Sequence, residues 1–347
     1  MRLPLSLLDL VPLGSASDSG QAIRNSLELA QSADQLGYTR YWFAEHHNMP
    51  TIASTTPEIL IALASEKTSR IRVGSGGVML PNHAPLKVAE AFKMLESLYP
   101  GRIDLGIGRA PGTDQATALA LRRSPEALGS DDFPAQLADL FAFGSPKGVA
   151  MRAGRFGAPM MVTAVPTGVS LPPVWLLGSS DYSAHLAAQL GLGFGFAAHF
   201  SDFPPEAPML AYRDEFTPGA IFTQPHAILT LSVICAPTVA KAERLAASLF
   251  VAFARLRTGQ SSMLLPPEQA LQYQFSPAES AVVQQIRAKQ IIGTPDAVKS
   301  RIEEIAARTM ADEVMVSTFI HGHADRLRSY ELLAEAFSIC PDSANAR

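Results

Sequence analysis

The feature of this chain that most constrains its fold is a regular alternation of apolar, strand-like segments with amphipathic, helix-like segments. The first strand-like segments occupy residues 5–11, 38–48, 71–75 and 102–108. A helix with an apolar stripe is expected after each of the first three, beginning near Gln21, Thr56 and Pro85. Because consecutive parallel strands need a crossover connection, this succession predicts right-handed βαβ units and a parallel sheet.

The same rhythm returns in the second half of the chain. Further strands are expected at residues 174–178, 193–198, 227–236 and 313–317. The count is then eight strands, each followed by a helix. A length of 347 residues suits one barrel better than a doubly wound sheet with a second domain. The sequence therefore predicts the α/β class and a single domain over residues 1–347, a (β/α)8 TIM barrel.

Three stretches depart from this rhythm. Residues 144–173 are rich in Gly, Pro, Met and Val and are expected to hold a small hairpin. Residues 258–290 form an irregular insertion after strand seven. Long loops in compact domains are usually lids or disorder, so we expect a mobile lid beside the mouth of the barrel. The last residues, 341–347, are expected to be a frayed tail.

Composition excludes several classes of function. A formal net charge of −4, with 17% charged residues, gives no basic footprint for nucleic acid. Two cysteines, Cys235 and Cys340, are too few for a disulfide framework or a thiolate metal site. The apolar start of the chain is short for a signal peptide and carries Asp9, and no run reaches the length of a membrane span. We therefore expect a soluble, cytoplasmic protein without a metal.

The second strand ends in an unusual group of polar residues. An apolar, aromatic run over residues 38–44 is followed by Glu45, His46, His47 and Asn48. Because side chains alternate along a strand, Glu45 and His47 would share one side and His46 would lie on the other. A helix cap or a salt-bridged strand end would explain this group equally well. In an α/β barrel, however, polar residues at the carboxyl end of a strand mark the active-site face.

The other predicted strands also end in polar or glycine residues. The set that would meet over the mouth is Glu45, His46, Gly76, Gly77, Arg109, Ser179, Ser180 and His199. It does not match a metal site, because the adjacent His46 and His47 cannot both face one ion from a regular strand. It contains no nucleophile elbow either, because the segment 178–180 lacks the second glycine of that motif.

An anion site is the other chemistry that these strand ends suggest. Residues 178–183 follow a strand and open a helix, so free backbone N–H groups and the hydroxyls of Ser179 and Ser180 lie together. Arg109, just past a neighbouring strand, would complete the site as a cation. Ordinary N-capping by the serines and a surface ion pair of Arg109 are the alternatives. The glycines at 106, 108 and 112 do not form a dinucleotide fingerprint, because the last falls one residue late.

Taken together and in order, these segments resemble the bacterial luciferase-like flavin monooxygenase family. The matching stretches are residues 44–47, 73–81 with Pro85, 101–109, 178–183 and 293–296. The resemblance covers about residues 5 to 337, and it is closest to the single-chain luciferase-like oxidoreductases rather than to the two-subunit light-emitting enzymes. Residues 144–173 depart from the luciferase pattern.

The resemblance implies a cofactor and a division of roles. Reduced FMN, supplied by a separate flavin reductase, would lie over the mouth of the barrel. Its phosphate would be bound by Arg109, Ser179, Ser180 and Ser183. Its ring would lie against Gly76 and Gly77, whose peptide bond the family leads us to expect in the cis form. His46 matches the family's catalytic imidazole, with Glu45 beside it on the same strand end.

The function implied is that of a flavin-dependent monooxygenase. Reduced FMN would react with O2, and the resulting peroxyflavin would oxygenate a small organic substrate that the sequence does not identify. A deazaflavin-dependent reductase or dehydrogenase of the same superfamily is one alternative, and a non-catalytic flavin-binding protein is another. The helix that begins near Thr56 is apolar over more than one face, at Ile59, Leu60, Ile61, Leu63 and Ala64. This pattern and the family both predict a homodimer.

Overall fold

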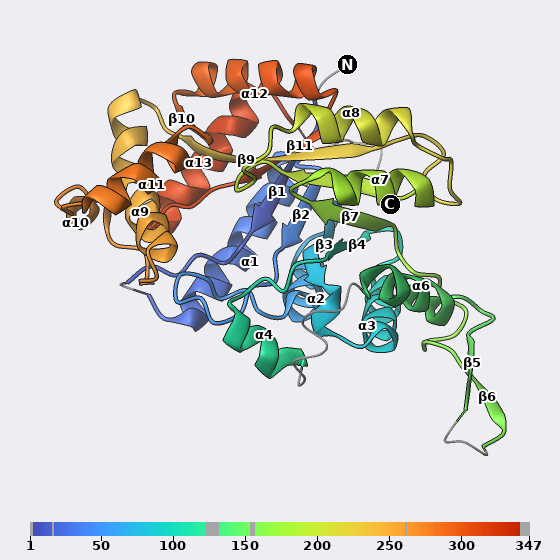
Figure 1. The fold of residues 1–347 in the computed structure, drawn as a ribbon. Coiled ribbons are helices and arrows are strands. Elements are labelled where there is room, and N and C mark those ends of the chain that lie inside the picture. The colour runs from blue at the N-terminus through green and yellow to red at the C-terminus, as the bar shows by residue number, and fades with distance from the viewer. Residues whose placement is uncertain (1–2, 16, 123–131, 153–156, 261, 341–347) are drawn as a thin grey trace.

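The computed structural model describes residues 3–15, 17–122, 132–152, 157–260 and 262–340, and its centre is a closed barrel of eight parallel strands (Figure 1). The strands are β1 (Leu5–Asp9), β2 (Arg40–Phe43), β3 (Arg72–Met79), β4 (Ile103–Gly108), β7 (Val174–Gly178), β8 (Gly193–Ala197), β9 (Ala227–Cys235) and β11 (Glu313–Ser317). They pair in the order β9-β11-β1-β2-β3-β4-β7-β8, and β8 pairs with β9 to close the ring. The predicted TIM barrel is confirmed.

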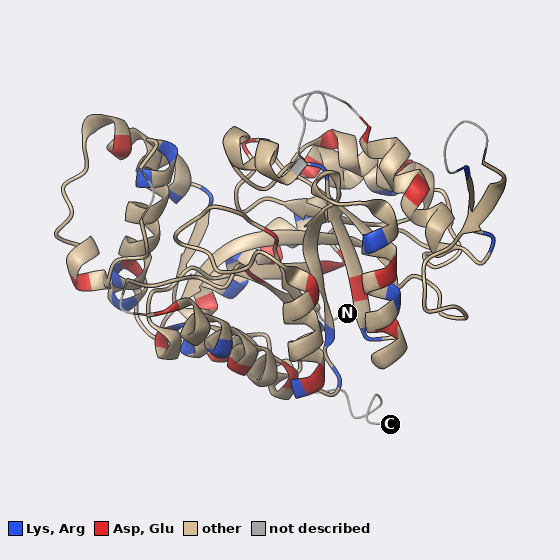
Figure 2. Cartoon of the chain, turned by 90° about the horizontal axis from the view of Figure 1, so that it is seen from below, with Lys and Arg blue, Asp and Glu red and all other residues tan. Residues whose placement is uncertain are grey.

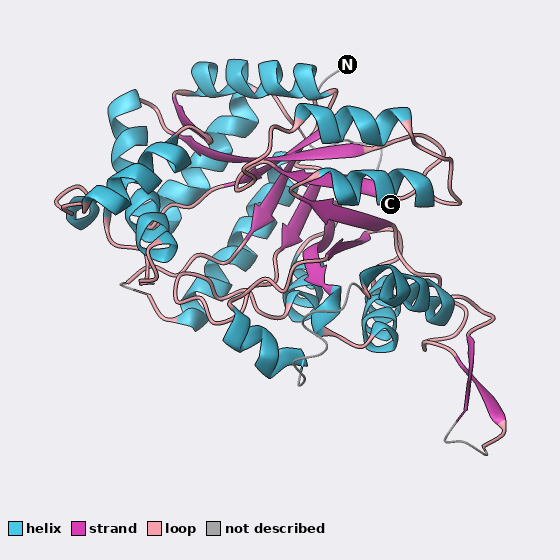
Figure 3. Cartoon of the chain, in the orientation of Figure 1, coloured by secondary structure: helices cyan, strands magenta, loops and turns pink. Residues whose placement is uncertain are grey.

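Helices surround the barrel, as Figure 3 shows. They are α1 (Ser19–Leu36), α2 (Pro57–Lys67), α3 (Pro85–Leu98), α4 (Gln115–Arg122), α6 (Phe133–Gly144), α7 (Asp181–Leu190), α8 (Glu206–Asp214), α9 (Val239–Arg257), α12 (Pro295–Thr309) and α13 (His323–Ala336). Local signals set their ends. The Asp18 side chain accepts a hydrogen bond from the Gln21 N–H at 2.8 Å, and Gly37 ends α1 at a φ of 90°. The short α4 was not predicted.

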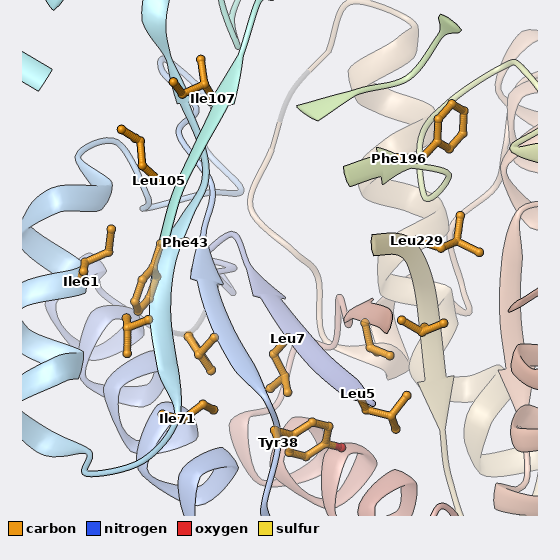
Figure 4. Packing of buried hydrophobic residues seen from close by; sticks show 14 of the residues in the cluster. Leu5, Leu7, Tyr38, Phe43, Ile61, Ile71, Leu105, Ile107, Phe196 and Leu229 are labelled. Atoms are coloured by element: carbon orange, nitrogen blue, oxygen red, sulfur yellow. The ribbon is translucent and has the colours of Figure 1, made fainter. Parts of the chain in front are cut away.

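The core follows the alternation of side chains along the strands. In β2, Tyr41 and Phe43 pack outward in the cluster that also contains Ile61 of α2, whereas Trp42 belongs to the second cluster with Met315 of β11. Figure 4 shows part of the outer cluster between strands and helices. Almost every residue of the eight barrel strands is buried, as expected for parallel strands covered on both sides.

A buried ion network lies at the amino ends of the strands, away from the mouth. Arg40 bonds Asp104 through Nη1 at 2.8 Å and Glu313 through Nε at 2.9 Å, and Trp42 Nε1 donates to Asp104 at 3.2 Å. Burial by itself would raise the pKa of Asp104, but the charges of Arg40 and Arg72 hold it below its usual value. At this end of a barrel such groups serve stability.

The first departure from the barrel is a hairpin. Strands β5 (Val149–Arg152) and β6 (Pro159–Val162) pair antiparallel, which confirms the hairpin predicted within residues 144–173. Figure 1 shows this hairpin projecting away from the barrel.

The second departure, residues 258–290, is more regular than predicted. It contains α10 (Pro267–Ala270) and α11 (Pro277–Arg287), and β10 (Gln290–Gly293) pairs with β9. The expectation of an irregular segment is therefore wrong for residues 277–290. A capping box between Ser276 and Glu279 begins α11, and the helix packs on α9. The role of this insertion as a lid stays a prediction.

The outer surface mixes both signs of charge. Figure 2 shows Lys and Arg interspersed with Asp and Glu along the outer helices. In the part of the chain that the structure describes, no helix is long and apolar enough to cross a membrane. The expected frayed tail, residues 341–347, lies outside the described residues.

Candidate active site

The end of β2 is held in place by the carboxylate of Glu45, which is fully buried. Nε2 of His47 and Nε2 of His83 both lie 2.9 Å from Oε1, and the backbone N–H of Met79 donates to Oε2 at 2.9 Å. The amide of Asn82 also donates to Oε1, at 3.2 Å. Glu45 and His47 therefore share one side, as strand alternation predicts. The carboxylate ties the end of β2 to the segment that follows β3.

These contacts keep Glu45 ionised. Burial alone would raise the pKa of its carboxyl, but the hydrogen bonds of His47, His83 and Met79 lower that pKa to about 2. His83 is affected in the opposite direction: burial would lower its pKa, and the hydrogen bond and charge of Glu45 raise it. A carboxylate with four donors has little capacity left to move a proton at neutral pH.

The described side-chain hydrogen bonds of this network do not include the ring of His46. Its Nδ1 atom is buried and has no hydrogen-bond partner among the described residues. Burial is the main reason that the pKa of His46 falls to about 4; the positive charge of His47 lowers it further, and Glu45 opposes the fall. The ring is therefore neutral at pH 7, and it can both donate and accept a hydrogen bond.

The glycines of β3 lie where its pairing with β4 shifts register, between Ser75 and Val78. The Gly76–Gly77 peptide bond is cis, as expected. A Cβ on Gly76 would come within 2.5 Å of Leu8 Cδ1, and a Cβ on Gly77 within 2.7 Å of Leu177 Cδ1. A Cβ on Gly77 would also lie 2.8 Å from the backbone carbonyl oxygen of Gly106, so packing favours glycine there, whereas at Gly76 the end of the Leu8 side chain could shift. The contact of these glycines with a flavin ring stays a prediction.

The residues expected to bind an anion lie where β4 and β7 end side by side. The guanidinium of Arg109 lies over the ring of Tyr182, in the first turn of α7, with its carbon 4.1 Å from the ring centroid. Arg109 is exposed and has no carboxylate partner among the described residues. Ser180 is the N-cap residue of α7, yet its hydroxyl makes no capping hydrogen bond. A free cation, a free hydroxyl and the first amides of a helix therefore lie together.

Two other predicted residues at this turn are arranged differently. The hydroxyl of Ser183 is buried and donates to the carbonyl of Leu177 at 3.2 Å, so it supports the turn between β7 and α7. The carbonyl of Ser179 accepts a hydrogen bond from the Ser201 hydroxyl at 2.7 Å, which joins this turn to the loop after β8. The hydroxyl of Ser179 makes no hydrogen bond to the described residues and remains available to a ligand.

The structure brings most of the predicted strand ends together, and it adds residues that were not predicted as site members. These added residues lie in or beside the predicted motifs of the sequence. They are Tyr182 and three partners of Glu45, namely Met79, Asn82 and His83. Their pairing depends on contacts across 34 to 38 positions, such as Glu45 with Met79 and with His83. Spacing within one motif could not reveal them. The sequence identified His199 only as a polar residue at the end of a strand and gave it no role in the site.

Polar side chains at the carboxyl ends of barrel strands, here the buried imidazole of His46 and the exposed Arg109 beside the start of α7, are typical of α/β-barrel enzymes. The family model described as luciferase-like monooxygenase matches residues 3–313, and the chain belongs to this family of oxidoreductases. A luciferase-like monooxygenase from Escherichia coli (strain K12) is 44% identical over 333 residues, which is 95% of this chain and 96% of that protein.

Solved structures agree with this assignment. The crystal structure of apo-MsnO8 superimposes with a TM-score of 0.85 at 37% identity, covering 98% of this chain and 99% of that chain. The oxygenating constituent of 3,6-diketocamphane monooxygenase from Pseudomonas putida, a type II Baeyer-Villiger monooxygenase solved with FMN, has a TM-score of 0.69 at 17% identity. It covers 99% of both chains and shows that the fold is shared.

Proposed function

We propose that this enzyme uses reduced FMN and O2 to oxygenate a small organic substrate. The observation that carries the proposal is the division of the mouth into two ends. One end has the unpaired cation Arg109 beside the start of α7, and the other has the neutral ring of His46. The diketocamphane monooxygenase, which has the same fold, was solved with FMN.

The residues at the first end suit a phosphate. Arg109 supplies a fixed positive charge, and the first amides of α7 have no acceptor within the helix. The hydroxyls of Ser179 and Ser180 add donors at the same turn. We assign the phosphate of FMN to these groups, and we assign Ser183 to the support of the turn because its hydroxyl already donates to Leu177. The flavin ring would then extend across the mouth towards Gly76, Gly77 and His46.

The residues at the second end suit proton handling. Reduced FMN, when bound, would supply the two electrons with which O2 is activated. The neutral ring of His46 can hold or give a proton there through Nδ1, which no described residue engages. Glu45 has its carboxylate oxygens occupied by four donors, so we propose that it acts as a positioning residue that fixes the strand end carrying His46.

The proposal also names partners. None of the glycine-rich segments matches a dinucleotide fingerprint, so we propose that a separate flavin reductase delivers reduced FMN. We further propose a homodimer and a cytoplasmic location. The deazaflavin-dependent alternative shares the barrel and its strand ends, and the binding of cofactors distinguishes it from the FMN enzyme.

A paired experiment tests the division of roles. Loss of a charge-assisted contact costs roughly 1.5–3 kcal/mol, so Arg109→Ala is expected to weaken FMN binding by about ten- to a hundredfold. His46→Ala is expected to leave FMN binding nearly unchanged and to reduce oxygenation by roughly 10²-fold, with hydrogen peroxide released instead. Flavin titration and product formed per O2 consumed are measured on both variants. Wild-type coupling in His46→Ala, or a loss of flavin as large as in Arg109→Ala, would refute the role of His46.

A further inference from the structure

His46 and His199 follow strands on opposite sides of the barrel. His46 comes after β2 and His199 after β8. The pairing order separates these strands by four steps in either direction around the ring of eight. The backbone N–H of His46 donates to the Ser54 carbonyl at 2.9 Å, and that of His199 donates to the Thr230 carbonyl at 3.1 Å. Both residues are therefore fixed at the carboxyl ends of their strands, where the mouth lies.

Both rings keep a nitrogen without a partner. Nδ1 of His46 and Nδ1 of His199 are buried, and neither has a hydrogen-bond partner among the described residues. Natural proteins pair nearly all buried polar atoms, because an unpaired one is unfavourable. Two such atoms on facing strand ends point to a ligand that satisfies them.

The two rings are close enough to interact electrostatically, and both are neutral. Burial is the main cause that lowers the pKa of His199 to about 3; a proton on His46 would lower it further, and the hydrogen bond with Thr230 opposes the fall. For His46 the pKa is about 4, again chiefly through burial. At pH 7 each ring therefore offers one N–H donor and one acceptor, and neither offers a charge.

We propose that His199 is a substrate-binding residue that, with His46, holds an uncharged oxygen-bearing group of the substrate, such as a ketone or a hydroxyl. This inference rests on the function proposed above. Neutral donors suit a neutral oxygen. The nearby charged groups are not available to the substrate, because Glu45 accepts hydrogen bonds from its four donors and Arg109 is assigned to the FMN phosphate. The rings of Phe200 and His199 meet edge-on, with their centroids 4.7 Å apart. Phe200 is 48% exposed, so it offers an apolar surface to the rest of the substrate.

The inference is tested on the FMN-loaded protein labelled with ¹⁵N-histidine, and in parallel without flavin. The probes are 2-decanone and decanoate, which share an alkyl chain but differ in the charge of the oxygen-bearing group. We expect 2-decanone to shift the ring nitrogen signals of both His46 and His199 at neutral pH, and decanoate to leave them unchanged. No response of His199 to 2-decanone, or an equal response to decanoate, overturns the proposal.

Variants provide the second readout. His199→Phe removes both ring nitrogens and is expected to weaken 2-decanone binding roughly tenfold, whereas His199→Gln, which keeps a donor and an acceptor, is expected to lose only about threefold. The matched control is His185→Phe, because His185 is exposed on α7 and bonds Glu215 at 2.7 Å. Equal affinities of His199→Phe and the wild-type protein overturn the proposal.

Flavin titration of the same proteins separates the two proposals. If reduced FMN does not bind the wild-type protein but 2-decanone shifts both rings, the FMN function fails and the role of His199 stands. If FMN binds and 2-decanone does not reach His199, the role of His199 fails and the FMN function stands.

Discussion

The guanidinium of Arg109 stacks on the ring of Tyr182, its carbon 4.1 Å from the ring centroid. Arg109 follows β4, and Tyr182 lies in the first turn of α7, which follows the adjacent strand β7. The contact therefore joins two neighbouring strand ends at the corner assigned to the phosphate. A stacked arginine loses little freedom when it binds an anion, because its planar group is already oriented.

The stacking predicts a graded effect of substitutions at Tyr182. A cation–π contact at an exposed site contributes about 0.5–1 kcal/mol, so Tyr182→Leu is expected to weaken FMN binding roughly two- to fivefold. Tyr182→Phe keeps the aromatic face and serves as the control, with an affinity close to that of the wild-type protein. Fluorescence titration with FMN measures both. An unchanged affinity in Tyr182→Leu would show that the stack does not orient Arg109.

From the lowered pKa of Glu45 we predict that this residue contributes to stability in a pH-dependent way. Its pKa is about 2 in the folded protein, against an ordinary value of 4.5, so the folded state favours the ionised carboxyl by about 3 kcal/mol. This contribution is present above pH 4.5 and is lost as the pH falls towards 2. The bond with His83, whose folded pKa is raised, contributes fully below the ordinary histidine pKa of 6.5 and is lost as the pH rises through the raised value.

We therefore expect Glu45→Gln to lower the free energy of unfolding by up to about 3 kcal/mol at pH 7, and by progressively less below about pH 4.5. Urea denaturation of both proteins at pH values of about 7, 5 and 3.5 measures this difference. Glu303→Gln, on the exposed surface of α12, is the control and should show no such trend. A difference between wild type and Glu45→Gln that stays constant over this range would contradict the assignment.

The sequence predicted the barrel well because each strand–helix unit has its own local signal. The cis bond at Gly76–Gly77 and the approach of Arg109 to the start of α7 were also predictable, from the family resemblance and from the meeting of strand ends. The helix α11 was missed although Ser276 and Glu279 form a capping box, because the neighbouring prolines suggested a loop. The four donors to Glu45 could not be predicted, because three of them come from residues 79–83, and the sequence does not show how this segment folds over the end of the neighbouring strand β2.

From the exposed apolar side chains of α2 and α3 we predict a homodimer. Leu60, Ile61 and Ala64 face the core, but Ile59 and Leu63 on α2 and Met94 and Leu98 on α3 are exposed, at 60%, 43%, 59% and 63%. The two helices pack side by side, so these four side chains share an outer surface that needs a partner.

We expect light scattering at micromolar concentration to give twice the chain mass for the wild-type protein. Leu63→Glu combined with Leu98→Glu should give a monomer, because two carboxylates would be buried in the interface. Leu190→Glu, at an exposed leucine of α7, is the control and should remain dimeric. A monomeric wild-type protein would rule out this use of the surface.

The contacts of Leu264 lead to a prediction about the insertion over residues 258–290 and its action beside the mouth. It is buried, its N–H donates to the Leu13 carbonyl at 3.0 Å, and its carbonyl accepts from the Ser15 N–H at 2.9 Å. The insertion is thus attached to the loop that follows β1. We expect Leu264→Ala to cost about 2–5 kcal/mol locally, to loosen this attachment and to increase the hydrogen peroxide released per O2 consumed.

The neighbouring Met263 is 39% exposed and provides the matched control, since Met263→Ala should leave peroxide release unchanged. Peroxide is measured against O2 uptake with reduced FMN and substrate. Equal peroxide release from Leu264→Ala and the wild-type protein would show that the insertion does not shield the reaction.

The most direct measurement is an anaerobic titration of the protein with reduced FMN and, separately, with a reduced deazaflavin, followed by admission of O2. We expect one reduced FMN per chain, bound at least about tenfold more tightly than the deazaflavin, since the two differ in the reacting ring, which we propose lies against His46. After O2 is admitted, the complex should release less hydrogen peroxide per O2 than free reduced FMN does. Preferred binding of the deazaflavin, or peroxide released at the rate and yield of free FMN, would contradict the assignment as an FMN-dependent monooxygenase.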